Sequence, residues 1–580
     1  MAIIGIDLGT TNSTAVVYKE GKVEFIPNAF GDYLTPSVVS KDGDSIIVGK
    51  IAKERLVHHA DKTAALFKRE MGNQTIIRLG KDKYTPEKLS AVVVQQLVAD
   101  AEAYLQEKVE EIVISVPAYF NAKQRLATKK IGDLLGIKVE RLINEPSAAA
   151  IACRDQEEDE TFIVFDFGGG TLDVSVVDCF ANVINICAIA GNNQLGGSDF
   201  DIAIANTFIQ QSKFPAKTVN DFVGANRNSL LYEAERVKLA LQDQDEVWMR
   251  YHFHKRTYEL LFTRDMLYTC AKPIFEKLKT VIGTAVKDSG FHAPEFTGVI
   301  LVGGSSYMPV VQDYLRELLA IPIMTSPDMN LLVAKGLGTY IAIKERKEEV
   351  ASLVVTDVCP FSLSTAVVSE IDPSVHLADV LIEKNTVLPT SKSLLLSPAN
   401  LGQKHVNIQV YQGESAYAKY NVLLGRRHVD LPVNFDRPEM FTLTYSYDIN
   451  SMLFVEVLVH STQERSIFQV GESDYLEDIT SKQTLEQIKD ISLKITRKPE
   501  IDLLEARILR VCEQTSKQKS KHLIEYWMET EKELKSNGQS LRKQHQIIEQ
   551  AHRVLDMYEK DNDLDRLDIF SDDDSKGFLS

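Results

Sequence analysis

Two short segments of the chain carry residue types that bind phosphate groups, and both have the same pattern. Asp7–Ser13 and Asp166–Asp173 each follow an apolar run, start with Asp, pass through Gly and small polar residues, and lead into a second apolar run. Glycines let backbone N–H groups approach phosphate oxygens closely, and hydroxyl groups add further donors. An Asp at a strand end can hold the hydrated Mg²⁺ that accompanies nucleotide phosphates.

A single Asp-x-Gly segment is also an ordinary β-turn, so one copy alone would be weak evidence. Two copies, each ending an apolar run, favour phosphate binding from two sides and indicate a duplicated α/β lobe. A third glycine turn, Val302–Ser306, precedes a predicted helix and could contact the other phosphates or the adenosine of a nucleotide. The sequence contains neither a GxxxxGK[ST] P-loop nor a GxGxxG that opens a helix, so it indicates neither of these nucleotide motifs.

Strands and helices must hold these segments in place, and the apolar pattern predicts both. Residues 1 to about 347 alternate short apolar runs with amphipathic segments, which is typical of an α/β domain. The predicted strands are Ala2–Ile6, Ser13–Tyr18, Glu111–Val116, Thr161–Phe165, Leu172–Val177 and Gly298–Val302. The predicted helices include Pro86–Gln106, Lys123–Leu135 and a short charged helix at Lys344–Glu349.

The pattern changes after residue 357. Short strands separated by turns predict a β-sandwich-like module from about 358 to 470. Its clearest strands are Val380–Glu383, Lys404–Tyr411, Phe441–Tyr447 and Met452–Val459. Helical spacing follows from about 482 to 560, first in Leu485, Ile488, Ile491 and Ile495, then in Leu503, Ile508, Leu509 and Cys512. The acidic segment Asp561–Ser580 has few apolar residues and is predicted to be flexible.

Composition limits the function classes. A chain of 580 residues is long enough for about three or four domains. Its 65 basic and 82 acidic residues give a net charge of −17, which speaks against nucleic-acid binding through the phosphate backbone. The six cysteines are far apart and form no CxxC pair, so we expect reduced thiols in a cytoplasmic protein. We expect no signal peptide and no membrane span, because no apolar run is long enough.

Six motifs together resemble the actin-like ATPase superfamily and, closely, the DnaK-type 70-kDa heat-shock chaperones. They are Gly5–Ser13, Val116–Phe120, Asn144–Ala150, Asp166–Asp173, Leu195–Asp201 and Leu301–Ser305. The resemblance covers about residues 2–470, and Lys62–Arg69 together with the short chain is most similar to the divergent HscC-type branch.

This resemblance implies a division of the chain. An α/β actin-like ATPase domain of two duplicated lobes occupies residues 1–349, and an interdomain linker occupies 350–357. A β-sandwich peptide-binding domain at 358–471 is followed by a short α-helical lid at 472–560 and the acidic flexible tail at 561–580.

The resemblance also implies roles in ATP hydrolysis. Lys68 and Glu145 place the attacking water, and Thr171 lies near the γ-phosphate. Asp7, Asp166 and Asp173 surround Mg²⁺ and K⁺, with Asp7 and Asp166 holding Mg²⁺ through water. Such roles suit phosphoryl transfer, in which the protein mainly positions water and neutralises charge. The residues expected to contact ATP or ADP are Gly9, Thr10, Thr11, Asn12, Gly168, Gly169, Gly170, Gly196, Gly197, Glu235, Lys238, Gln242, Gly303, Gly304, Ser305, Tyr307 and Asp328.

Several of these residues have a simpler interpretation when taken alone. Lys68 could be a surface charge, Glu145 could cap a helix, and Glu235 with Lys238 could be an i,i+3 surface pair. The adenosine end also departs from the family pattern. Tyr307 stands where an Arg is usual, and Gln242 is the polar residue one turn beyond Lys238. Tyr307 could still stack on adenine.

The remaining implied sites couple the domains and bind peptide. The interdomain switch is expected at Pro117 and Arg125 and at the apolar linker residues Leu353, Val354 and Val355. The walls and arch of the peptide groove are expected at Val367, Val368, Ala399, Val406, Ile408, Val410 and Ile449. Alternation such as that of Val406, Ile408 and Val410 also occurs in the core of any sandwich.

The resemblance implies an ATP-dependent chaperone that binds extended apolar segments of unfolded polypeptides, with affinity switched by ATP binding and hydrolysis. Its expected partners are a J-domain co-chaperone near Arg125 and the linker, and a nucleotide exchange factor. We expect a monomer. The alternative is a regulatory protein of the same family that keeps nucleotide but cycles clients little. A metabolite kinase or a filament-forming ATPase of the superfamily would lack the module at residues 358–470.

Overall fold

The computed structural model describes residues 2–153, 159–254, 256–347, 350, 353–369, 371–471, 492–494, 498–535 and 541–560. It divides into two compact units. The first unit comprises residues 1–37, 66–199 and 271–492, and the second comprises 38–65, 200–270 and 493–580. Each is described below by itself.

Two sheets of the first unit repeat one local arrangement. In each, a central strand pairs antiparallel with the strand that follows the glycine turn and parallel with a later strand. The strand orders are β11-β10-β1-β2-β3, with β4 on β2, and β18-β17-β12-β13-β14-β19-β22. This repetition agrees with the duplication predicted from the two Asp-Gly segments.

The predicted strands and the two long predicted helices of this region are confirmed, with ends that differ by at most a few residues. The strands of the first sheet are β1 (Ala2–Asp7), β2 (Asn12–Lys19), β3 (Lys22–Ile26), β4 (Thr35–Pro36), β10 (Val109–Val116) and β11 (Lys138–Asn144). Those of the second are β12 (Glu160–Phe167), β13 (Leu172–Phe180), β14 (Val183–Asn192), β17 (Gly298–Val302), β18 (Ile323–Met324), β19 (Val354–Val358) and β22 (Val387–Leu388). The helices are α2 (Pro86–Leu105), α3 (Ala122–Leu135), α4 (Glu145–Cys153), α8 (Lys272–Ser289), α9 (Pro309–Leu319) and α10 (Leu332–Lys344).

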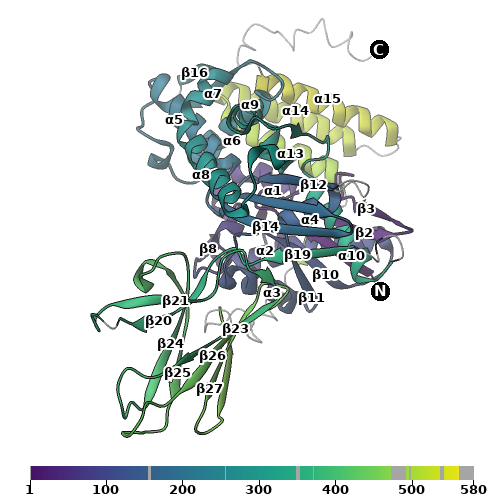
Figure 1. The fold of residues 1–580 in the computed structure, drawn as a ribbon. Coiled ribbons are helices and arrows are strands. Elements are labelled where there is room, and N and C mark those ends of the chain that lie inside the picture. The colour runs from purple at the N-terminus through teal and green to yellow at the C-terminus, as the bar shows by residue number, and fades with distance from the viewer. Residues whose placement is uncertain are drawn as a thin grey trace, which may run out of the picture. The chain divides into compact units, whose positions relative to one another are not determined.

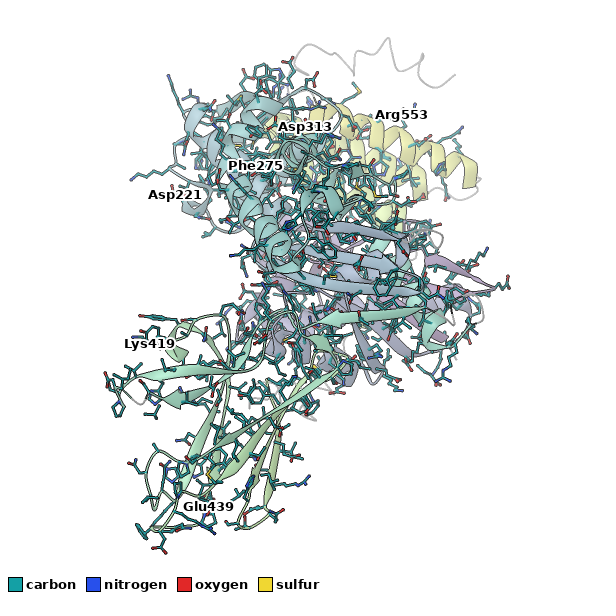
Figure 2. The ribbon with its side chains drawn as sticks, viewed as in Figure 1. Asp221, Phe275, Asp313, Lys419, Glu439 and Arg553 are labelled. Carbon is teal, nitrogen blue, oxygen red and sulfur yellow. The ribbon has the colours of Figure 1, made fainter. Side chains whose placement is uncertain are left out.

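Local sequence explains where these helices start and how closely they pack. The Thr85 hydroxyl accepts the Lys88 N–H ahead of Pro86 at the start of α2, and Asn121 with Gln124 forms a capping box at α3. Helices α4 and α10 approach closely, since a Cβ at Gly336 would lie 1.7 Å from the Ala148 carbonyl oxygen. Farther along, the Phe275 ring on α8, labelled in Figure 2, lies 4.6 Å from the Tyr314 ring on α9.

The β-sandwich predicted at about 358–470 is present in the first unit and is drawn in green in Figure 1. One sheet has the order β21-β20-β24-β25 and the other β23-β26-β27-β28. Inward side chains such as Val410, Leu443 and Val455 form a common buried core. The strands are β20 (Leu363–Val368), β21 (His376–Ile382), β23 (Thr390–Leu396), β24 (His405–Gln412), β25 (Val422–Asp430), β26 (Phe441–Tyr447), β27 (Leu453–Val459) and β28 (Arg465–Gln469).

The second unit gathers three separate parts of the chain. Helix α1 (Lys50–His58) packs against α6 (Gly224–Ala240) and against α13 (Pro499–Gln514), the first of three helices near the C-terminus. Its other elements are β5 (Val39–Asp42), β6 (Ser45–Val48), β7 (Thr63–Ala64), β15 (Glu246–Phe253), β16 (Arg256–Thr263), α7 (Arg264–Cys270), β29 (Ser492–Leu493), α14 (Lys517–Lys535) and α15 (Leu541–Lys560). Helix α5 (Gly197–Gln211) begins in the first unit and continues into the second.

Two helix predictions were wrong. Helix α10 ends at Lys344 and Arg346 has a φ of 55°, so the charged helix predicted at Lys344–Glu349 does not form in its described part. The helical pattern predicted from about 482 is interrupted at Ser492–Leu493, a short strand beside β6, and the Lys494 N–H donates to the Ile46 carbonyl. Leu485, Ile488, Ile491 and Ile495 lie outside the described residues, as does the tail at 561–580. No helix among the described residues is both long and apolar enough to cross a membrane.

Candidate active site

The tips of the two glycine hairpins meet in the first unit. A Cβ at Gly169 would lie 1.7 Å from the Thr11 hydroxyl oxygen, and one at Gly170 would lie 2.5 Å from the Thr10 methyl group. Gly196 packs on the second tip, and its Cβ would lie 2.4 Å from the Gly170 nitrogen. Glycine is therefore required wherever these turns touch. The structure brings together the predicted phosphate contacts at 9–12, 168–171 and 196–197.

Lys68 and Glu145 form a buried ion pair beside these hairpins. The Lys68 ammonium nitrogen lies 2.9 Å from Glu145 Oε1, and the two residues are only 3% and 6% exposed. Lys68 comes from the 3₁₀ helix Phe67–Glu70, whereas Glu145 is the first residue of α4. The interpretation of Lys68 as a surface charge is thus wrong. Each charge compensates the other where water is excluded.

Three aspartates concentrate negative charge near this ion pair. Burial, with a further contribution from Glu145, raises the pKa of Asp7 to about 6 and that of Asp173 to about 7. The same causes raise the pKa of Asp166 well above its ordinary value. The Ser115 hydroxyl donates to Asp7 Oδ1 at 2.7 Å, and the Tyr119 N–H donates to Asp173 Oδ1 at 3.1 Å.

This charge fits a divalent cation held through water. Asp173 Oδ2 is buried and has no hydrogen-bond partner among the described residues. Carboxylates forced together in this way release their protons more readily when a cation lies between them. Within the described ranges, no group of three or more His, Cys, Asp or Glu side chains could hold a metal directly. Asp7 and Asp166 remain the residues that would hold hydrated Mg²⁺.

The third glycine turn is tied to the second hairpin. The Ser305 hydroxyl donates to the Gly168 carbonyl at 2.8 Å. Gly303 has a φ of 81°, and a Cβ there would lie 2.9 Å from Asp166 Oδ1. A Cβ at Gly304, the next residue, would lie 3.1 Å from Asn330 Oδ1. The Tyr307 hydroxyl donates to the Pro327 carbonyl at 2.6 Å, which fixes its phenol ring in the loop that contains Asp328.

Of the residues expected at the adenosine, Glu235, Lys238 and Gln242 lie in the second unit, whereas Tyr307 belongs to the first. Glu235 on α6 pairs with Lys53 on α1 at 2.9 Å, and Lys238 pairs with Asp201 on α5 at 2.7 Å. Glu235 and Lys238 are therefore each bound to a different partner and do not form the simple i,i+3 pair. Gln242 lies beyond the end of α6, where its carbonyl accepts from Arg264 at 3.1 Å.

Arg125 belongs to a buried polar cluster that the sequence did not reveal as a whole. It is 1% exposed and donates to the carbonyls of Phe120 and Ala118 and to Asn144 Oδ1. The Asn144 amide donates to Asp357 Oδ2 at 2.5 Å.

Ser147 joins the same cluster, because its hydroxyl donates to Asp357 Oδ2 at 3.0 Å. Burial raises the pKa of Asp357, while these hydrogen bonds oppose the rise. Asn144 immediately precedes Glu145, so Asp357 is joined to the Lys68–Glu145 ion pair through one hydrogen bond and one peptide bond. The sequence motif Asn144–Ala150 supports the family resemblance but predicts no role for Asn144 or Ser147. Pro117 lies close by, where its carbonyl accepts the Phe120 N–H.

The linker itself is a strand. β19 lies between β14 and β22 in the second sheet and pairs parallel with β14, with Val354 beside Val183 and Val355 beside Ile184. Leu353 and Val355 pack against the core of the ATPase region, whereas Val354 is 51% exposed. The three linker residues therefore face alternately inward and outward, as a strand requires.

The structure separates the seven predicted groove residues. Val368 at the end of β20 is 41% exposed, and Val367, Val406 and Ala399 are also at least partly accessible. Ile408 and Val410 are buried in the sandwich core. Ile449 lies in the turn between β26 and β27, beside Asn450, whose side chain accepts the Leu142 N–H of β11. It is therefore not brought together with Val368, which lies at the far end of β20.

Comparisons with known proteins agree with this arrangement. The model of one family, described as Hsp70 protein, matches residues 3–78 and 73–573. A protein named Chaperone protein DnaK from Halobacterium salinarum, strain ATCC 29341 / DSM 671 / R1, is 36% identical over 468 residues, covering 78% of this chain and 72% of the relative. A DnaK of the same species from strain ATCC 700922 / JCM 11081 / NRC-1 gives the same identity and coverage.

Proposed function

The chain belongs to the Hsp70 family, and from this premise we propose that it is a chaperone whose grip on extended apolar peptides is switched by ATP binding and hydrolysis. Membership makes the chain an ATPase of the chaperone class that uses ATP or ADP with Mg²⁺. One observation carries the finer proposal. Asp357, at the end of the linker, is hydrogen-bonded to Asn144, the neighbour of the catalytic candidate Glu145.

In the proposed mechanism, hydrolysis of ATP depends on how the protein positions the phosphates and the attacking water. Backbone N–H groups and hydroxyls of the two hairpin tips hold the phosphates, and Lys68 with Glu145 orients the attacking water. Mg²⁺, when bound, neutralises charge on the phosphate oxygens, and K⁺ completes the ion set that Asp7, Asp166 and Asp173 attract. We assign the contact with the γ-phosphate to Thr171, at the second tip.

The proposed coupling between the nucleotide site and the β-sandwich depends on the linker strand β19. With β19 on β14 and Asp357 bound to Asn144 and Ser147, a change around Glu145 reaches the sandwich through two hydrogen bonds. Nucleotide states that differ in their contacts near Glu145 would shift the population of the docked linker. Arg125 is buried in this arrangement, so a J-domain co-chaperone would act on the linker edge and influence Arg125 indirectly.

The peptide site is proposed at Val367, Val368, Ala399 and Val406, which are accessible members of the predicted set. Ile449 is accessible as well but lies apart from them, in the turn between β26 and β27. An extended peptide would bind there through backbone hydrogen bonds and place an apolar side chain between these residues. Ile408 and Val410 support the site from the core. Unfolded polypeptides are the clients, and a nucleotide exchange factor is a further proposed partner.

Peptide stimulation of ATP hydrolysis tests this function. We expect an extended apolar peptide to raise the steady-state ATPase rate of the full chain several-fold, and a charged peptide of equal length to have no effect. An ATPase rate that no apolar peptide changes would favour the alternative, a regulatory family member that cycles clients little.

A further inference from the structure

The three C-terminal helices α13, α14 and α15 form one bundle, drawn in yellow in Figure 1 and called here the C-terminal bundle. Leu504, Ile508, Trp527 and Leu555 are among the side chains of its apolar core. This core explains how the bundle folds. It does not explain how the bundle packs against α1 and α6. The packing of the bundle on α1 and α6, within the same unit, includes directed polar contacts.

One arginine of α13 makes the central contact of this packing. Arg510 is 2% exposed, and its Nε donates to Glu54 Oε2 on α1 at 2.5 Å. Its guanidinium group also pairs with Glu559 on α15 and lies 4.2 Å from the centre of the Tyr232 ring on α6. A planar guanidinium suits this place because it forms directed hydrogen bonds at its edge and stacks on an aromatic ring with its face.

Glu54 completes a three-way junction. While Oε2 of Glu54 accepts from Arg510, its Oε1 accepts the Tyr232 hydroxyl at 3.2 Å. One carboxylate of α1 is therefore shared between α6 and α13. Two neighbouring contacts also join α1 to α6, namely the Lys53–Glu235 ion pair at 2.9 Å and the hydrogen bond from Asn228 to the Leu56 carbonyl at 2.7 Å.

The two helices joined in this way come from different halves of the ATPase region. Helix α1 precedes the second Asp-Gly hairpin in the chain, and α6 follows it. Helix α6 also carries Glu235 and Lys238, the residues expected at the ribose and adenine. Contacts that fix α6 against α1 limit the motion by which α6 could release an adenosine.

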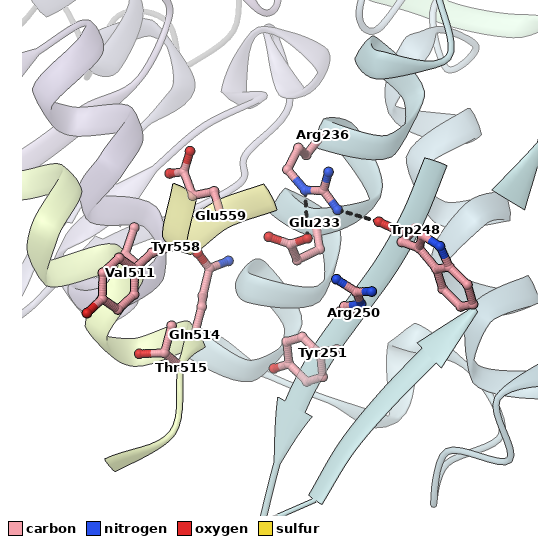
Figure 3. Close-up of a pocket in the computed structure, with 10 residues that line it drawn as sticks. All are labelled: Glu233, Arg236, Trp248, Arg250, Tyr251, Val511, Gln514, Thr515, Tyr558 and Glu559. Carbon is pink, nitrogen blue, oxygen red and sulfur yellow. Dashed lines mark hydrogen bonds and ion pairs between the residues drawn. The ribbon is translucent and has the colours of Figure 1, made fainter. Parts of the chain in front are cut away.

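The rest of the seam combines polar and apolar side chains and is incompletely filled. A cavity of about 30 Å³ lies there, lined by residues of α6 and β15 and by residues of α13 and α15. Figure 3 shows the side chains that line it. Arg236 spans its edge by donating to Glu233 and to the Trp248 carbonyl. Gln514 Nε2 is buried and has no partner among the described residues, although its Oε1 accepts from Arg510. A cavity of this size can hold a water molecule between the polar groups that line it.

We propose that Arg510 is a positioning residue through which the C-terminal bundle holds α1 and α6 together and slows the release of bound nucleotide. Moving α6 away from α1 while the bundle is seated would separate Arg510 from Glu54 or from Tyr232. Each separation leaves a buried charge poorly compensated. Unseating the bundle frees α6 and lets the nucleotide leave. This inference rests on the proposed nucleotide binding and extends it to a role for the bundle.

The test measures dissociation of a fluorescent ADP analogue from the full-length protein, chased with excess unlabelled ATP. We expect Arg510→Ala to raise the dissociation rate about tenfold, the change that corresponds to loss of one charge-assisted contact. Arg507→Ala is the matched control. Arg507 pairs with Glu559 and Asp556 inside the bundle, and among the described residues it forms no hydrogen bond or ion pair with α1 or α6, so we expect its rate within about twofold of wild type.

The Glu54→Gln variant changes the partner of Arg510 on α1 and leaves the bundle itself unchanged. Its dissociation of the ADP analogue is measured in the same way. We expect it to release the analogue several-fold faster than wild type, with unchanged helical circular dichroism. Wild-type rates in both Arg510→Ala and Glu54→Gln would overturn the inference, as would an Arg507→Ala variant as fast as Arg510→Ala. Failure of the wild-type chain to bind the analogue would overturn the proposed function as well.

Discussion

Replacing Lys68 with alanine is expected to lower the single-turnover rate of ATP hydrolysis by about 100-fold or more. The ammonium group lies 2.9 Å from Glu145 in a buried site, where a charge that orients water and stabilises developing negative charge contributes most. The variant also leaves Glu145 unpaired beside Asp7, Asp166 and Asp173, whose pKa values it already raises. The measurement is quenched-flow hydrolysis with enzyme in excess over ATP.

Two controls separate catalysis from folding in this experiment. Lys62→Ala removes an exposed lysine just upstream and is expected to leave the rate unchanged. The double variant Lys68→Ala, Glu145→Gln restores the charge balance and is expected to hydrolyse ATP no faster than Lys68→Ala, because the pair acts as one unit. Near-normal hydrolysis by Lys68→Ala would remove Lys68 from the mechanism.

Replacing Asp357 with alanine is expected to abolish stimulation of the ATPase by peptide while basal hydrolysis stays within about threefold of wild type. The change removes the acceptor for Asn144 and Ser147 and leaves both donors unsatisfied in a buried site. Such a loss costs about 1–3 kcal/mol, enough to remove a coupling of roughly 5- to 150-fold. The lost contact is with Asn144, and the Lys68–Glu145 pair itself is unchanged, so basal hydrolysis continues.

The matched control for this prediction is Asp436→Ala, which changes an exposed aspartate in a loop of the sandwich. We expect its stimulation by peptide to equal that of wild type. Full stimulation in Asp357→Ala would show that the linker hydrogen bonds carry no signal. Equal loss of basal and stimulated rates would instead place Asp357 in catalysis.

Individual strands and helices of this fold could be predicted where the residues within the segment determine its conformation. Gly298–Val302 was predicted with both ends correct, since an entirely apolar run between turns has few alternatives. The helix predicted at Lys344–Glu349 failed where Arg346 takes a positive φ, and the helical pattern predicted from about 482 is interrupted where Ser492–Leu493 pairs with β6. In the second case, tertiary pairing overrode a helical spacing.

The candidate site was predictable in its residue types but not in its long-range contacts. The paired hairpins indicated phosphate binding from spacing alone, and Lys68 and Glu145 followed from the resemblance. The bond between Asn144 and Asp357 joins residues 213 apart in sequence, and the bond between Arg510 and Glu54 joins residues 456 apart. No periodicity encodes such contacts, because they depend on how separately folded elements pack.

The central claim, that ATP switches the grip on peptide, is tested most directly by peptide release. The full chain is loaded with a fluorescent extended apolar peptide in the presence of ADP and then mixed with ATP or with more ADP in a stopped-flow instrument. Val355→Asp places a charge on the inward face of β19, whereas Val354→Asp places the same charge on the exposed face. We predict that ATP speeds release at least about tenfold in wild type and Val354→Asp but not in Val355→Asp. Equal release rates with ATP and ADP in the wild-type chain would contradict the account.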